Sequence, residues 1–81
     1  MITQTLQFPE DFRRGCALVT LEGRERVCIE NFKGICSYTE QEISLMTYRS
    51  RIFVRGRQLR IDSYTKDQIE ISGLIEMIKY E

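Results

Sequence analysis

Histidine and tryptophan are absent from this 81-residue sequence, and proline occurs once. Without histidine there is neither a Ser-His nor a Cys-His catalytic pair. Histidine is also the commonest general base near neutral pH and the commonest zinc ligand, so both of these roles lack their usual residue. No stretch matches the phosphate-binding patterns GxxxxGK[ST] or GxGxxG. We therefore expect a protein that is not an enzyme and that uses no metal or cofactor.

Long apolar runs are also missing. None approaches the ~20 residues that span a bilayer. The N-terminal stretch MITQTLQFPEDF has neither the basic nor the apolar region of a signal peptide. Cys16, Cys28 and Cys36 are odd in number and have no CxxC spacing. We expect a cytoplasmic protein that does not insert into a membrane, with three reduced thiols that pack as small hydrophobic groups.

Charge of one sign is not in excess, because 12 basic residues balance 12 acidic ones. Net charge therefore gives no reason to expect nucleic acid or an anionic membrane as the partner. The apolar fraction of 42% and the charged fraction of 30% are typical of a folded globular protein. A chain of this length forms one domain with one core. We place the domain at residues 15–81, after a polar N-terminal arm, residues 1–14, that Phe8 and Pro9 are expected to anchor.

From residue 16 onward, apolar residues recur at every second position, which is the period of a β-strand. Gly23, Gly56 and Gly73 interrupt the pattern as turn signals. The alternating runs lie at 17–21, 27–32, 43–48, 51–55, 59–62, 68–72 and 75–80. We predict an all-β fold, a small antiparallel sandwich of seven to eight short strands, immunoglobulin-like or jelly-roll-like. No stretch offers the crossover helix that a parallel sheet needs.

One turn pattern occurs twice. The tripeptide SYT at positions 37–39, with apolar residues at 43 and 45, recurs 26 residues later at 63–65, with apolar residues at 69 and 71. Two hairpins with the same turn would produce this repeat, although chance would also do so in a short chain. The Thr39-x-x-Glu42 spacing matches a helix capping box. Because alternating β-branched and aromatic residues follow, we interpret it as a turn, with a short helix as the alternative.

Arginine is concentrated in one segment. Five arginines fall within 12 residues that contain no acid: Arg49, Arg51, Arg55, Arg57 and Arg60. If the strands on either side of Gly56 pair across a turn, these side chains form one cationic patch. Guanidinium groups bind carboxylate and phosphate bidentately, so the patch could dock an acidic protein, anionic lipid or RNA. The structural alternative is cross-strand pairing with Glu70 and Glu76.

Strand edges offer another way to bind. An open sandwich leaves backbone groups unpaired at its edges, where a strand of another chain can add. The run at 74–80 is the most apolar candidate for such an edge. The domain could use it to form a homo-oligomer or to accept a strand from a partner protein.

The segment 27–43 (VCIENFKGICSYTEQEI) contains a turn motif formed by Asn31, Gly34, Tyr38, Thr39 and Glu42. Asn and Gly tolerate a positive φ, and Thr39 and Glu42 can bond the backbone of a turn, so we expect a structural role, with a partner epitope as the alternative. The sequence resembles the YabP/YqfC family of bacterial sporulation proteins, in particular its YqfC-like branch. The resemblance rests on this motif and on the order and spacing of further residues from Phe8-Pro9-Glu10-Asp11 to Tyr80. They include Val19-Thr20, Gly23, Val54-x-Gly56, Leu59-x-Ile61 and Ile71-x-Gly73.

This resemblance implies a role in endospore formation, in the cytoplasm of the mother cell. It also implies a partner, because such relatives are typically encoded beside a larger membrane-anchored sporulation protein. We therefore expect a protein-binding or adaptor module, with peripheral attachment at the forespore-facing membrane as an option. Two alternatives stay open: a basic-faced module that binds anionic lipid or RNA, of which nucleic acid is the less expected, and a self-assembling structural piece of the spore envelope.

Overall fold

The computed structural model describes residues 16–81, which form six β-strands and no helix. The strands are β1 (Leu18–Glu22), β2 (Arg26–Glu30), β3 (Phe32–Tyr38), β4 (Glu42–Thr47), β5 (Arg51–Tyr64) and β6 (Gln68–Tyr80). All neighbours are antiparallel, in the order β1-β2-β6-β5-β4-β3. The all-β, antiparallel prediction is confirmed. The predicted arm, with Phe8 and Pro9, lies outside the described residues, and no helix of residues 16–81 could cross a membrane.

The strands form one open sheet rather than a sandwich of seven to eight short strands. The difference arises at Gly56 and Gly73, which lie inside β5 and β6 and do not end them. The runs 51–55 and 59–62 are therefore one strand, and 68–72 and 75–80 are another. Bulged residues interrupt the alternation in the sequence as a turn would, although the strand continues past them.

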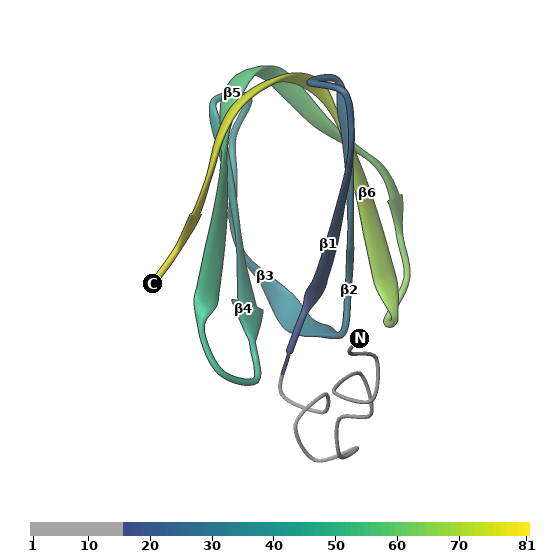
Figure 1. The fold of residues 1–81 in the computed structure, drawn as a ribbon, viewed down its shortest axis with the longest axis vertical. Helices are drawn as coiled ribbons and strands as arrows, with labels where there is room; N and C mark the ends of the chain where they lie inside the picture. Colours follow the sequence, from purple (N-terminus) through teal and green to yellow (C-terminus); the bar gives the residue numbers. More distant parts are fainter. Residues whose placement is uncertain (1–15) are drawn as a thin grey trace, which may run out of the picture.

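Both long strands bend at the same point of their shared ladder. Register shifts lie at Arg55/Gly56 and Arg57/Arg60 of β5, and Gln58 and Gly73 have φ values of 53° and 134°. A Cβ on Gly56 would overlap the carbonyl oxygen of Leu74. The backbones of β5 and β6 are thus in direct contact at the bend. Figure 1 shows that the sheet folds over there, so that the half with β1 and β2 faces the half with β3 and β4.

The turns of two hairpins supply hydrogen-bond acceptors to this bend. Gly73 and Ile75 donate their N–H groups to carbonyl oxygens of the β1–β2 turn, at 3.2 and 2.8 Å. Gly56 and Leu59 donate in the same way to the β3–β4 turn, at 3.0 and 2.9 Å. Backbone groups that a bulge removes from the ladder need other partners when they are buried. The β1–β2 turn therefore satisfies the backbone of β6 at the bend, and the β3–β4 turn satisfies the backbone of β5.

The core lies between the two halves of the sheet. Its members are fully or almost fully buried: Val27, Ile29, Phe32, Ile43, Leu45, Ile52, Val54, Leu59, Ile69, Ile71 and Ile75. All of them except Phe32 follow the period-two alternation of the predicted runs, in which Phe32 would lie on the side opposite Ile29. Asn31, with φ 66°, breaks the alternation and turns Phe32 into the same core, where its ring stacks on Tyr64 at 5.9 Å. Burial of each large side chain contributes about 1.5–3 kcal/mol.

Gly56→Ala tests the contact between β5 and β6. We expect it to lower the free energy of unfolding by about 1–3 kcal/mol, because the added methyl group must push two backbones apart. Gly34→Ala is the matched control, since Gly34 also lies in a strand and, apart from Gly34 and its two chain neighbours, no atom of residues 16–81 is within 4 Å of the position its Cβ would take. Urea unfolding measures both variants. Equal effects at the two positions would contradict the close contact.

Candidate functional site: a basic outer face

The outer side of the half that contains β4 and the start of β5 carries part of the predicted arginine cluster. Alternation along β5 buries Ile52 and Val54 in the core and turns Arg51 and Arg55 to the solvent, as the sequence predicted. Phe53 lies between them on the same side and is half-buried. The outward positions of β5 are thus cationic, aromatic and cationic in turn.

The register places apolar side chains among these cations. Neighbours across the ladder are Met46 and Arg51, Phe53 and Lys79, and Arg55 and Met77. Paired residues project from the same side of a sheet. Met46, Phe53 and Met77 therefore form a diagonal apolar stripe across three strands, with Arg51 and Lys79 on one side of it and Arg55 on the other. We call these six residues the basic outer face.

The cations of this face differ in how they are neutralised. Arg55 Nε lies 2.7 Å from Oε2 of Glu42, its cross-strand neighbour. Lys79 Nζ lies 3.3 Å from a carboxylate oxygen of Glu81 and 6.0 Å from the centre of the Phe53 ring. Within residues 16–81, no carboxylate lies within ion-pair distance of Arg51. Arg51 therefore presents the least compensated positive charge of the face, beside the exposed Met46.

The structure does not gather all five arginines. The predicted turn at Gly56 is wrong, because β5 continues through it and its two parts lie on opposite halves of the sheet. Arg57 is 3.4 Å from Glu76, one of the two acids named as structural partners. Arg49 lies in the β4–β5 turn, where its guanidinium approaches the Cys16 sulfur at 3.9 Å. Cross-strand pairing thus accounts for part of the cluster, and Arg51 is the member of it without a carboxylate partner in residues 16–81.

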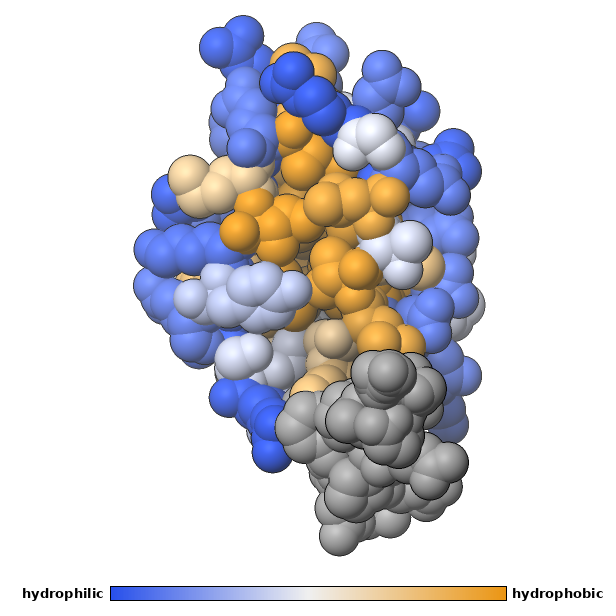
Figure 2. All heavy atoms as spheres, viewed as in Figure 1, coloured by the Kyte–Doolittle hydropathy of each residue, from blue (hydrophilic) through white to orange (hydrophobic). Residues whose placement is uncertain are grey.

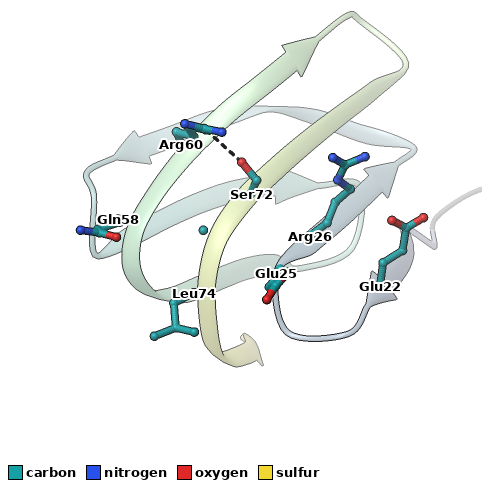
Figure 3. A pocket seen from close by; sticks show the side chains of 8 residues that line it. Glu22, Glu25, Arg26, Gln58, Arg60, Ser72 and Leu74 are labelled. Carbon is teal, nitrogen blue, oxygen red and sulfur yellow. Dashed lines mark hydrogen bonds between the residues drawn. The ribbon is translucent and has the colours of Figure 1, made fainter.

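Arg60 lies beyond the bend, on the outer side of the other half. Its Nε donates to Ser72 Oγ at 3.1 Å and to Asp62 Oδ1 at 3.2 Å. Figure 3 shows it beside an open pocket to which Arg26, Glu22 and Glu25 also contribute. Charges of both signs line this pocket, so it has no clear preference for a cation or an anion.

The turn motif of residues 31–42 has a mainly structural geometry. Asn31 adopts the predicted positive φ, and its Nδ2 donates to the Cys16 carbonyl at 2.6 Å. Gly34 does not need this freedom, since it lies inside β3 with φ outside the left-handed region. Tyr38 Oη accepts a 3.4 Å hydrogen bond from the Ile61 N–H and so links β3 to β5 across the fold. The predicted turn at Thr39 and Glu42 is confirmed, and no helix forms there.

Threonine closes three of the hairpin turns in the same way. Thr39 Oγ1 accepts from the N–H groups of Gln41 and Glu42, at 3.2 and 2.9 Å. Thr65 does the same with Asp67 and Gln68, so the predicted repeat is confirmed as a repeated turn. The sequence reasoning missed a third copy at Thr47, which bonds the N–H groups of residues 49 and 50 at 3.1 and 2.8 Å. The shared signal is Thr-x-x-polar, since the SYT tripeptide is absent from the third copy.

The outer side of the other half carries Cys28. Burial raises the pKa of the Cys28 thiol, and the carboxylates of Glu30, Glu70 and Glu22 raise it further, while a hydrogen bond with Gln68 partly offsets the increase. None of the three cysteines forms a disulfide in residues 16–81. The expectation that all three pack as small hydrophobic groups is wrong for Cys36, which is exposed.

Thr39→Val removes the hydroxyl of the first turn and keeps the shape of the side chain. We expect a loss of about 1 kcal/mol in the free energy of unfolding, because two N–H groups lose their acceptor. Thr39→Ser, which keeps the hydroxyl, should recover most of this loss. Thermal unfolding of the three proteins checks the expectation, and a loss in Thr39→Ser without one in Thr39→Val would show that the methyl group matters instead.

The thiols should differ in reactivity. Only the thiolate reacts with an alkylating reagent, so the raised pKa predicts slower labelling of Cys28 than of Cys36 at neutral pH. Glu30→Gln with Glu70→Gln should lower the pKa and move the pH profile of Cys28 labelling to lower pH. Mass spectrometry of the labelled peptides measures both rates, and unfolding without reductant should expose all three thiols. A profile that the substitutions leave unchanged would contradict the effect of the carboxylates.

Comparison with known proteins identifies the family of the chain. A sequence model of the YabP family matches residues 15–81. The chain is also similar to the protein YqfC of Bacillus subtilis (strain 168), with 27% identity over 79 residues that cover 98% of this chain and 85% of that protein. The family match spans all six strands, both bends and the basic outer face. The chain belongs to the YabP family.

Proposed function

We propose that this protein is a non-enzymatic protein-binding module that acts in the cytoplasm of the mother cell during endospore formation. Membership of the YabP family suggests the link to sporulation. The observation that carries the binding role is the basic outer face, where three cations surround a stripe of two exposed methionines and a phenylalanine.

The composition of this face is that of a protein interface. Arginine, methionine and aromatic residues are enriched at such interfaces, because they combine large contact areas with directed hydrogen bonds. Methionine also adapts its shape to different apolar partners. The complementary surface would carry carboxylates for Arg51 and Arg55 around apolar side chains. We expect it on a membrane-anchored sporulation protein, as the family resemblance implies, which would hold this protein peripherally at the forespore-facing membrane.

A second candidate is binding of anionic lipid, which the same cations favour. Each basic residue near an anionic surface contributes about 1 kcal/mol, and salt weakens this attraction strongly. RNA is the less favoured ligand, because a base would need a free aromatic face to stack on. Phe53 is half-buried and lies under Lys79, so its ring offers little of that face.

Capture from sporulating cells tests the proposal. The tagged protein, with gently solubilised membranes, should enrich a membrane sporulation protein that the same bait does not capture from vegetative cells. Arg51→Glu with Arg55→Glu should reduce that capture by more than about tenfold, because reversing charges inside an interface costs several kcal/mol. Mass spectrometry quantifies the captured protein. The thermal midpoint should fall only slightly, because both arginines are exposed and the one ion pair that is lost, Arg55 with Glu42, lies at the surface.

The matched control is Arg60→Glu with Lys66→Glu. It changes the net charge by the same amount, but Arg60 lies on the other half of the sheet and Lys66 in the β5–β6 turn. It should leave capture intact. Equal loss in both variants would mean that overall charge, and not this face, drives binding. Retention in both would reject the face as the docking site, and binding to anionic vesicles that high salt abolishes would favour the lipid candidate.

A further inference from the structure

The C-terminal half of β6 has one side that no strand covers within residues 16–81. On its other side it pairs with β5 along its length. The uncovered side meets β2 only from Gln68 to Ser72. After the bend, the N–H groups of Gly73 and Ile75 bond to the β1–β2 turn. From residue 76 to residue 80, the strand is therefore an open edge.

The hydrogen bonds of the ladder show which groups this edge presents. Arg51 and Glu81 exchange two N–H···O bonds of 2.8 Å each. In an antiparallel ladder, residues bond alternately to one neighbour and to the other side. Since Glu81 bonds to β5, the N–H and C=O groups of Tyr80 and Ile78 point away from β5. The open edge thus offers two donors and two acceptors in the plane of the sheet.

The edge formed by β3 is interrupted in a way that this edge is not. Proteins block exposed edges with short strands, bulges, proline or charged residues. β3 has register shifts at two places. The charged residues of the β6 edge, Glu76 and Lys79, are already paired with Arg57 and Glu81. No proline lies in this strand. From Met77 to Tyr80 this edge therefore has neither a register shift nor a proline to block pairing.

Apolar surface accompanies the open edge. Met77 and Tyr80 are 47% and 58% exposed. A groove beside the edge is lined by Leu21 of β1 and by Ile75 and Ile78 of β6. Figure 2 shows a band of apolar residues down the middle of the view, between the two halves of the sheet. An added strand would cover apolar side chains as well as pair its backbone.

We propose that the occupant of this edge is a second copy of the chain, whose β6 pairs antiparallel with the first about Ile78. Each copy supplies the same edge, so the pairing is two-fold and closes at a dimer. It places Ile78 against its own counterpart, Met77 against Lys79 and Glu76 against Tyr80, so that no like charges lie directly opposite. The chain has a net charge of zero, so the two copies do not repel at long range.

This pairing would enlarge the basic outer face. A two-fold axis perpendicular to the sheet keeps the outer sides of both copies on the same side of one continuous sheet. Met77, the last residue of the apolar stripe, would then lie next to Lys79 of the second copy. Two basic outer faces would meet at the dimer axis and could bind a partner in two places. The dimer itself does not depend on the proposed function.

Sedimentation velocity of the full chain over a wide range of concentration tests the dimer. The wild type should shift from monomer to dimer as concentration rises. Tyr80→Pro removes the outward N–H without touching a bond to β5, and should stay monomeric. Tyr80→Ala loses the same side chain but keeps the N–H, and should still dimerise. A wild type that stays monomeric, or that grows beyond a dimer, would overturn the inference.

Charge changes at Met77 test the register and do not depend on whether the proline variant folds. Met77→Glu would face Lys79 of the second copy and should lower the dimer Kd several-fold, because opposite charges across a ladder attract. Met77→Lys would face the same lysine and should raise the Kd by a similar factor. Met77 is exposed, so both variants should fold. The reverse order, or no difference, would rule out pairing about Ile78.

Discussion

The close contact of β5 and β6 at their common bend is the constraint on which the rest of this structure depends. Gly56 and Gly73 lack the side chains that would separate the two backbones. Because the strands can approach there, one sheet folds over and encloses its own apolar side. A chain of 81 residues thus obtains a two-sided core with only six strands in its described part. Without this contact the sheet would be flatter, and one side of it would expose isoleucine, leucine and valine.

The same bend decides how charge is distributed. The arginines on β5 are close in the sequence, but the bend turns the strand between Arg57 and Arg60. Arg51 and Arg55 therefore share one outer side with Lys79, whereas Arg60 lies with Ser72 on the other. The basic outer face is a product of three strands, and its apolar members come from β4, β5 and β6 in turn.

Both proposed modes of binding use surfaces of the sheet. The proposed docking face uses side chains on the outer side of the sheet, and the proposed dimer uses backbone groups at its edge. The two meet at Met77, which belongs to the apolar stripe and borders the open edge of β6. A partner bound at the face of one copy would therefore lie near the dimer axis, so association and partner binding can affect each other.

The sequence by itself determined five of the six strands and the core side of most of them, since period-two alternation depends only on local geometry. It did not predict β3, whose residues it assigned to a turn motif. It also determined the threonine turns, which need residues only three positions apart, as at Thr39 and Thr65. The turns predicted at Gly56 and Gly73 are wrong, because a bend within a strand and a turn between strands use the same residue types. Phe32 was misplaced for a related reason, as the left-handed Asn31 changes the side on which the alternation continues.

Only the tertiary structure decided the register, and with it the site. Met46, Phe53 and Met77 come together because β4, β5 and β6 pair at one alignment, and a shift by one residue would turn each strand's side chains to the opposite side. Which edge stays open likewise depends on where β2 ends beside β6, at Ser72. Such long-range pairings involve residues tens of positions apart, and local patterns do not encode them.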